Sequence, residues 1–307
     1  MRRLNEFRLY YNHTIYPELL RLERKRKQLL LLLFASIFIV IAVFSLGLYL
    51  NILSITLSLL LPIGFYITYL LYRIQQFRAT FKPHVVNLLL DFIDDSLNFG
   101  TLKYDAKRFI PKPIFLASQI FATDAPFYLG EDYIEGKIGE LDFELCELNV
   151  KEYSKVRSRL NYVFRGILLH ATFKKPMKGA ILILPRKFRQ YLSRTIRLFN
   201  RLGGKSVDHI HNTAFEEIFM TYATPDSDYM NLLSEDMQES ILDFRDRTGK
   251  EIYVSFKGNE IYIAVTEPKD ILEPFIFKSN ISFALIREFF EEIQLLLTII
   301  EDFDANH

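Results

Sequence analysis

The stretch at residues 28–72 decides the architecture, and its sequence is QLLLLLFASIFIVIAVFSLGLYLNILSITLSLLLPIGFYITYLLY, which contains no charged residue. As a single helix this run would be about 67 Å long, twice the roughly 30 Å hydrocarbon core of a bilayer. It must therefore fold back, and the polar residues Asn51 and Ser54 mark the break. The sequence predicts a transmembrane hairpin with helices at about residues 29–50 and 55–72.

A signal peptide or a soluble core helix fits this run less well. A signal peptide has one short apolar region followed by a small-residue cleavage site, and this chain shows neither feature. A helix in the core of a soluble protein has a polar face, whereas this run is apolar on all sides, which is typical of a segment in lipid. Pro62 and Gly64 are tolerated in membrane helices.

Charges beside the run predict its orientation. Five basic residues precede the first helix and are opposed only by Glu23, three more follow the second helix, and the turn between the helices has none. They are Arg21, Arg24, Lys25, Arg26 and Lys27, then Arg73, Arg78 and Lys82. Because positive flanks stay in the cytoplasm, we expect both termini there. The single cysteine, Cys146, fits a reducing compartment and is expected to be a small buried side chain.

The segment ahead of the hairpin has two interpretations. Apolar residues between Phe7 and Leu22 alternate with basic ones, as in an amphipathic segment that lies at the lipid surface. Alternatively, this segment continues the first membrane helix, although Pro17 favours a break. In both cases we assign residues 1–83 to a membrane anchor.

Residues 84–307 are expected to form one compact cytoplasmic domain. Apolar alternation and helical spacing occur in mixed order along this part of the chain, which predicts an α+β fold with one antiparallel sheet covered by helices. Helices are expected at 84–98, 115–121, 187–200, 232–244 and 283–300, and strands from 133 and at 141–150, 162–173, 180–184, 206–211, 218–222, 252–256 and 260–265.

The strongest feature of this domain is a basic belt, residues 153–207, which holds 14 Lys/Arg and no Asp/Glu. Its predicted helix places basic residues on one face and apolar residues on another. We therefore expect the belt to bind anionic lipid or an acidic partner, with each charge near a leaflet contributing about 1 kcal/mol. The candidate binding residues are Lys174, Lys175, Lys187, Arg194, Arg197 and Arg201.

Internal pairing is the alternative for these charges. The acidic segments on either side, residues 84–152 and 208–307, hold 13 and 21 Asp/Glu against 6 and 7 Lys/Arg. Residues 84–307 together hold 27 Lys/Arg and 34 Asp/Glu, a net charge of 27 − 34 = −7. Because the net charge is negative and no recognition motif is present, nucleic acid is not an expected partner.

Two histidines are a candidate metal site. In a strand, His209 and His211 would point to the same face, and Glu216 and Glu217 follow closely. The alternative is that they are ordinary histidines, because no spacing fixes a third ligand. His170, on the predicted strand 162–173, is expected to be structural. No cofactor motif is found, since the glycine-rich stretch 136–139 lacks the phosphate-loop ending.

Several short motifs, in order, resemble a known family. The family is the uncharacterised bacterial membrane family catalogued as domain of unknown function 3137, and the resemblance runs from about residue 20 to about residue 280. It implies a bacterial protein of the inner membrane and carries over no activity or catalytic residue. The motifs are GEDYIEGKIG at 130–139 with Phe143 and Glu147, Phe164-Arg165-Gly166, Phe215, Phe219 and Tyr222, Leu232-Leu233, and IYIA at 261–264.

Three hypotheses on function follow. The first is a non-enzymatic, membrane-tethered module that docks on anionic lipid or a membrane protein through the basic belt. The second is a membrane-associated enzyme, assisted by a metal at His209 and His211. The third is a subunit of a larger membrane complex whose hairpin packs on partner helices through small residues, namely Ala35, Ser36, Gly47 and Gly64. The sequence leaves the oligomeric state open.

Overall fold

The protein is described by a computed structural model that covers residues 4–94, 99–139, 141–154, 159–173, 176, 178–207, 212–268 and 273–305. The chain divides into two compact units. Unit 1 comprises Met1–Phe92 and Leu272–Arg287, and unit 2 comprises Ile93–Ile271 and Glu288–His307. Each unit is described by itself. The end of the membrane anchor at residue 83 stays a prediction.

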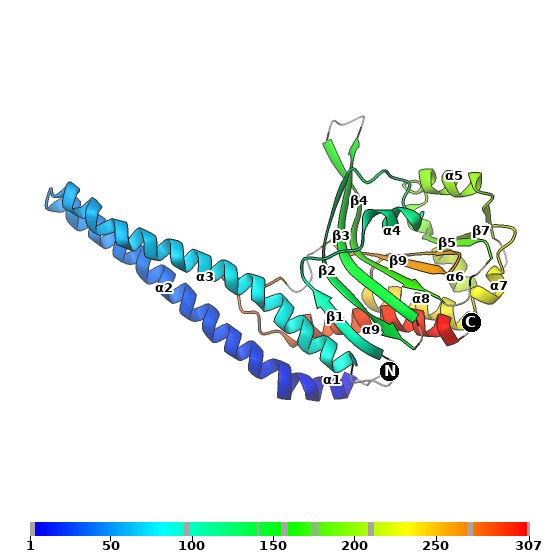
Figure 1. Cartoon of the computed structure of the whole chain (residues 1–307), viewed down its shortest axis with the longest axis horizontal. Helices are drawn as coiled ribbons and strands as arrows, with labels where there is room; N and C mark the ends of the chain where they lie inside the picture. The colour runs from blue at the N-terminus through cyan, green and yellow to red at the C-terminus, as the bar shows by residue number, and fades with distance from the viewer. Residues whose placement is uncertain are drawn as a thin grey trace. The chain divides into compact units, whose positions relative to one another are not determined.

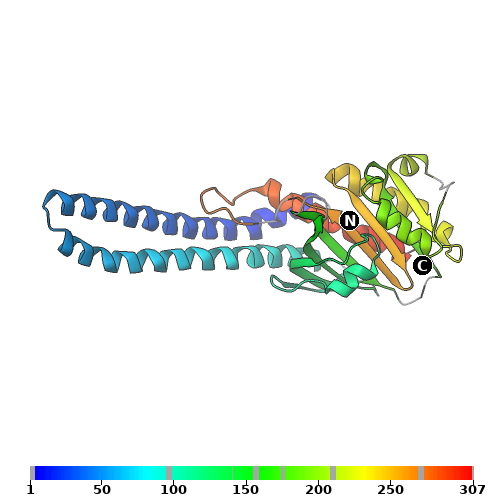
Figure 2. The same cartoon turned by 90° about the horizontal axis from the view of Figure 1, so that it is seen from above.

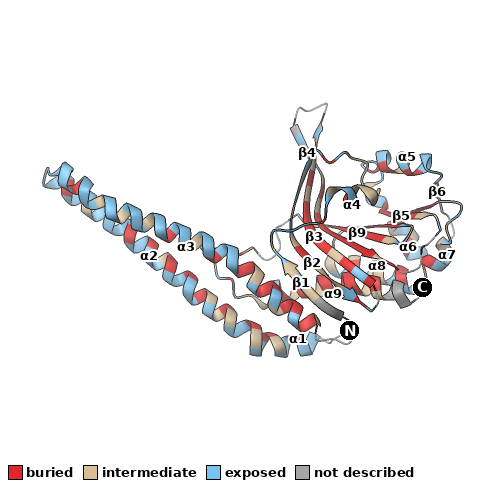
Figure 3. Ribbon diagram, viewed as in Figure 1, coloured by how far each residue is buried: buried red, intermediate tan, exposed pale blue. Residues whose placement is uncertain are grey.

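Unit 1 is built on two long helices. A short helix α1 (Leu4–Tyr10) and a π-helical turn η1 (Tyr11–Ile15) lead into α2 (Tyr16–Tyr49), and α3 (Leu53–Asp94) follows a short turn. The helical stretches Leu4–Tyr49 and Leu53–Asp94 are long and apolar enough to cross a membrane, with mean hydropathies of 3.1 and 1.8 in their most apolar windows. Only 11% of each window is buried (Figure 3). The predicted pair of apolar helices is confirmed.

Both helices extend farther than predicted, because two prolines do not end them. Pro17 lies at the start of α2, directly after the π-helical turn η1, and the helical stretch Leu4–Tyr49 runs through it. The segment ahead of the hairpin is therefore helical and continuous with α2. Pro83 lies inside α3, so the helix expected at 84–98 is the end of α3. Burial of Phe81, Val85 and Leu89 offsets the lost hydrogen bond.

Gly47 allows α2 and α3 to approach each other closely. A Cβ atom added to Gly47 would lie 2.0 Å from Oγ1 of Thr56, so a larger residue would push the helices apart. Ser36 and Thr56 are buried, and their hydroxyls donate to the carbonyls of Leu32 and Ile52 at 2.7 and 3.0 Å. These polar groups are thus satisfied within their own helices, as a lipid environment requires.

Unit 2 contains a nine-stranded sheet (Figure 1). All strand pairs in the described residues are antiparallel, and the order is β1-β2-β3-β4-β9-β8-β5-β7-β6. At the edges lie β6, which has two residues, and β1, whose register shifts between Gly100 and Lys103. The bounds are β1 Phe99–Asp105, β2 Phe127–Ile138, β3 Leu141–Ser154, β4 Arg159–Thr172, β5 Ala180–Pro185, β6 Lys205–Ser206, β7 Phe219–Ala223, β8 Ile252–Lys257 and β9 Glu260–Thr266.

Helices cover both faces of this sheet. On one face, α4 (Lys112–Ala117) and α5 (Ser193–Arg201) bury Phe115 and Phe199 in a core with strand residues such as Phe164. On the other lie α8 (Glu235–Thr248) and the part of α9 (Phe283–Ala305) from Glu288 onward (Figure 1). The predicted α+β fold, an antiparallel sheet covered by helices, is confirmed.

Gly166 allows the two central strands β4 and β9 to meet. Its φ of +149° lies in a region that side chains rarely adopt, and an added Cβ atom would lie 1.9 Å from the carbonyl oxygen of Val265. Only glycine fits at this point without moving the backbone. Gly166 belongs to one of the motifs that carry the family resemblance.

The helix expected at 187–200 begins later than predicted. A 3-10 turn η2 (Arg186–Phe188) comes first, and α5 starts at Ser193. Ser234 caps α8, because its side chain accepts from the N–H of Met237. The strand expected at 206–211 is seen as β6, and residues 208–211 lie outside the described part of the chain. Two short helices complete the fold, α6 (Thr213–Ile218) and α7 (Tyr229–Leu232).

Candidate functional site

The later part of the basic belt, from Arg186 to Lys205, forms an exposed face around α5. Leu192 and Phe199 are buried against the sheet, which turns the basic residues of α5 outward. This amphipathic arrangement is the one predicted from helical spacing. We call the following exposed side chains the α5 surface: Arg186, Lys187, Arg189, Arg194, Arg197, Arg201 and Lys205.

Two residues of the α5 surface are paired with carboxylates. Nζ of Lys187 lies 3.6 Å from Oε1 of Glu251, and Nη1 of Arg194 lies 3.6 Å from Oε2 of Glu152. The side chains of Lys187 and Arg194 remain 72% and 60% exposed. Such exposed pairs contribute about 0–1 kcal/mol and are screened by salt, so they leave these cations available to a competing anion.

The other cations of this surface have no carboxylate partner among the residues described. Arg186 donates to the carbonyl oxygens of Glu216 and Phe219, and Nε of Arg197 donates to Ser193 at 3.2 Å. These are bonds to neutral backbone groups and leave the charge uncompensated. On the α5 surface, internal pairing among the described residues thus accounts for Lys187 and Arg194 alone.

Apolar side chains stand beside the cations. Tyr191 is 84% exposed, Leu202 is 54% exposed and Leu198 is 39% exposed. Basic residues next to exposed apolar and aromatic ones are the composition of surfaces that lie in a lipid headgroup region. These exposed apolar side chains were not predicted from the sequence, because Leu198 and Leu202 were assigned neither to the basic face nor to the apolar face of the expected helix.

Four predicted site residues fall outside the described part of the chain. They are Lys174 and Lys175 of the basic belt and the two metal candidates, His209 and His211. Their roles stay predictions.

A second polar site lies on the sheet, around His170. Nδ1 of His170 is 2.9 Å from Oε1 of Glu144, Nε2 is 3.5 Å from Oε1 of Glu260, and the ring stacks on Tyr262. The hydroxyl of Tyr133 donates to Glu144 at 2.6 Å. These residues come from β2, β3, β4 and β9. Glu144, His170 and Tyr133 are among those that line an open cavity of about 310 Å³.

The charge state of this cluster follows from its hydrogen bonds. Burial alone would raise the pKa of Glu144, but the bonds from His170 and Tyr133 outweigh burial and hold that pKa below its usual value. Burial and the bond to Glu144 together raise the pKa of Tyr133. The cluster is therefore an ionised carboxylate held by two donors, which agrees with the structural role expected for His170.

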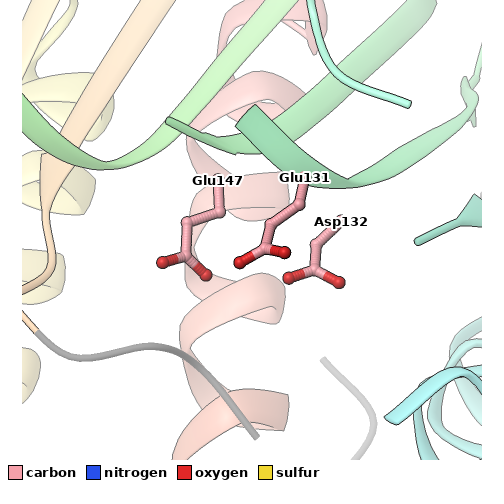
Figure 4. Close-up of side chains that lie close together, drawn as sticks. All are labelled: Glu131, Asp132 and Glu147. Carbon is pink, nitrogen blue, oxygen red and sulfur yellow. The ribbon is translucent and has the colours of Figure 1, made fainter. Parts of the chain in front are cut away.

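Three carboxylates gather where β2 bulges against β3 (Figure 4). One oxygen atom from each of Glu131, Asp132 and Glu147 lies within 4.8 Å of the others. The left-handed conformation of Asp132, with φ at +59°, accompanies the bulge that brings the neighbours Glu131 and Asp132 together. Carboxylate oxygens suit hard cations, but each residue has further interactions within the chain, and the cluster by itself assigns no ligand.

A partly buried lysine joins two buried carboxylates. Nζ of Lys250 bonds to Glu267 and Glu292, which ties the ends of α8 and β9 to α9. Burial lowers the pKa of Lys250, yet the two carboxylates outweigh burial and raise it overall. Glu267 and Glu292 are buried, and Lys250 bonds to both of them. The three residues therefore form a structural ion cluster.

These features define a class of protein: an α+β domain with a basic, partly apolar surface, in a chain with two helices long and apolar enough to cross a membrane. Residues 162–305 match the model of a family described as protein of unknown function (DUF3137), which confirms the family resemblance. The motifs before residue 162 lie outside the matched segment.

No curated protein matches the chain. Among solved structures, the crystal structure of the mycobacterial trehalose monomycolate transport factor A, TtfA, is similar at 9% sequence identity and a TM-score of 0.30. The similarity covers 63% of this chain and 88% of that chain. Function is therefore argued from the residues of this chain.

Proposed function

We propose that this chain is a membrane-anchored module that docks on anionic lipid headgroups through its α5 surface. The observation that carries the proposal is the set of exposed cations without a carboxylate partner in the described chain, namely Arg186, Arg189, Arg197, Arg201 and Lys205, beside exposed apolar residues. The two apolar helices supply the anchor. The flanking charges favour the cytoplasmic side of a bacterial inner membrane.

The strength of such docking fits a tethered domain. Five cations near an anionic leaflet contribute about 1 kcal/mol each, which alone gives weak and reversible binding. Because the anchor keeps the domain close to a bilayer, its effective concentration there is high, and weak contacts are sufficient. Binding of this kind weakens with salt.

A fluorescence experiment tests the proposal on the full-length chain, because the protein contains no tryptophan. The variant Tyr191→Trp places a single reporter on the α5 surface. In nanodiscs of phosphatidylcholine with phosphatidylglycerol, we expect tryptophan emission at shorter wavelength than in phosphatidylcholine alone. Adding Arg194→Gln, Arg197→Gln and Arg201→Gln should abolish the difference.

A matched control neutralises arginines elsewhere in unit 2. Arg245 and Arg247 on α8 already pair with Asp246 and Asp243, so Arg245→Gln with Arg247→Gln should leave the lipid-dependent shift unchanged. Equal emission in the two lipid compositions, or a shift that survives the triple substitution, would contradict lipid docking. An acidic membrane protein would then be the partner to seek, by affinity purification from native membranes.

A further inference from the structure

We propose that residues 273–282 form a membrane-interface loop, in which Phe275 and Phe277 insert into the boundary between headgroups and acyl chains. This inference rests on the membrane-anchor part of the proposed function and is independent of the α5 surface. The loop belongs to unit 1, together with α2 and α3. It lies beside α2 in Figure 2, where it is drawn in orange.

The start of the loop is held on α3. Oε1 of Glu273 lies 3.5 Å from Nζ of Lys82, and Oε2 lies 3.8 Å from Nη2 of Arg78. Lys82 is buried, although lysine is rarely buried unless it is paired. These contacts place the first residue of the loop beside the part of α3 that follows the apolar run.

The middle of the loop is held on α2 by a buried ion pair. Nη2 and Nε of Arg26 lie 2.6 and 2.9 Å from the two carboxylate oxygens of Glu23. Nη1 of the same guanidinium donates to the backbone carbonyl of Ile276. The backbone N–H of Asn280 lies 3.5 Å from Glu23. The charged side chains of Glu23 and Arg26 are thus buried where the loop packs on α2.

The loop is also closed on itself. The side-chain oxygen of Asn280 accepts from the N–H of Phe275 at 2.7 Å, and its amide nitrogen donates to the carbonyl of Phe275 at 2.9 Å. Asn280 itself is buried. Residues 276–279 therefore form a short apex of fixed conformation, and Phe275 and Phe277 are presented by a rigid support.

The level of the apex follows from helix geometry. Arg26, which binds the apex, lies three residues before Leu29, about 4.5 Å below the expected start of the hydrocarbon core. The interfacial layer on each side of a bilayer is about 5–7 Å thick, so the apex lies within it. Lys82, which binds the start of the loop, is ten residues past Tyr72, or about 15 Å away. From its start near Lys82, the loop thus runs toward the membrane, and its apex near Arg26 is the part closest to the hydrocarbon core.

The exposed side chains of the loop suit this level. Phe277 is 75% exposed and Phe275 is 54% exposed, and Nζ of Lys278 lies 5.9 Å from the centre of the Phe275 ring. Two exposed phenylalanines on a rigid apex do not stabilise a surface that faces water. Apolar rings beside a cation are instead typical of segments at the membrane–water interface. Because the loop is continuous with the apolar part of the hairpin, the bilayer is the occupant that these rings fit.

Three single-tryptophan variants of the full-length chain test this inference in nanodiscs. Phe277→Trp reports on the apex, and Phe38→Trp reports on the middle of α2. Leu9→Trp is the matched control, because Leu9 is 61% exposed in the same unit and lies about 30 Å along the helical segment from Leu29. Phosphatidylcholine with brominated acyl chains quenches tryptophans in contact with lipid.

We expect brominated lipid to quench Phe38→Trp and Phe277→Trp and to leave Leu9→Trp unchanged. Emission of Phe277→Trp should also lie at shorter wavelength than that of Leu9→Trp. If Phe38→Trp is quenched while Phe277→Trp behaves like Leu9→Trp, the loop does not insert and this inference alone is overturned. If Phe38→Trp is not quenched, the membrane anchor itself is wrong, and both proposals fall. Phe275→Trp repeats the test with a second ring of the loop.

Discussion

The backbone N–H of Ile110 donates a hydrogen bond to the sulfur of Cys146, and the two atoms are 3.2 Å apart. Cys146 has no exposed surface, and burial raises the pKa of its thiol. The sequence analysis expected a small buried side chain here. Since reactivity requires an accessible thiolate, we predict that the native protein resists thiol reagents.

The measurement is labelling by a fluorescent maleimide before and during heating. Label should enter only as unit 2 unfolds, because Cys146 is the only cysteine in the sequence. Rapid labelling of the native protein at neutral pH would contradict the prediction. If it holds, the same thiol reports the stability of unit 2 in the variants below.

The link between Glu144 and His170 predicts a loss of stability in acid. The pKa of Glu144 is held below its usual value of 4.5 in the folded state, so its contribution is present above that value. It is lost as the pH falls through the lowered pKa. Glu144→Gln removes a charged hydrogen-bond partner and should cost about 1.5–3 kcal/mol at neutral pH.

The melting temperature from circular dichroism, measured between pH 3 and pH 7 in wild-type protein and Glu144→Gln, checks this prediction. The difference between the two proteins should shrink as the pH falls below 4.5. Asp142→Asn is the control, because Asp142 is exposed and pairs with Lys137 at the surface. A difference that grows in acid would show that the carboxylate is not stabilised by these bonds.

Gly166→Ala should destabilise unit 2 strongly. The added Cβ atom would lie 1.9 Å from the carbonyl oxygen of Val265, so β4 and β9 must separate locally. We expect a cost above about 1 kcal/mol, beyond the usual penalty for a residue with positive φ. Gly258→Ala is the matched control, because Gly258 also has positive φ, at +63°, but an added Cβ atom meets no neighbour. Equal melting temperatures for both variants would contradict the close contact.

Lys250→Met should leave Glu267 and Glu292 buried without the cation between them. Breaking a buried pair in this way costs about 3–5 kcal/mol. Burial already raises the pKa of Glu292, so protonation favours the folded state, and stability of the variant should recover as the pH falls toward 5. Lys257→Met, at an exposed position on the β8–β9 hairpin, should change little. A Lys250→Met protein as stable as wild type at pH 8 would refute the role of this cluster.

The hairpin was predictable because its signal is local. A charge-free run that is too long for one transmembrane helix and is interrupted at Asn51 and Ser54 predicts a hairpin of two helices. The ends of the helices were not predictable from the same signal, since Pro17 was taken to favour a break and Pro83, inside α3, does not end that helix. The cost of Pro83 is offset by the burial of Val85 and Leu89, which local sequence does not reveal.

The class of the sheet followed from alternation, whereas its strand order did not. β4 pairs with β9 through Gly166 and Thr266, which are 100 positions apart (266 − 166). The partners of His170 were not predicted, because Glu144 lies opposite it on β3 and Glu260 comes from β9, although His170 itself was expected to be structural. The α5 surface was predictable in its charges, because an acid-free segment is visible without knowledge of its neighbours.

In a chain anchored in a bilayer as proposed, the two borders of the sheet have a further consequence. Exposed strand edges are templates on which copies of a protein join, and confinement to two dimensions raises the frequency of such encounters. Here β6 offers two residues and the exposed Lys205, and β1 is irregular and carries the exposed Lys103. Neighbouring copies therefore find little continuous backbone to pair with, which limits edge-to-edge joining of their sheets.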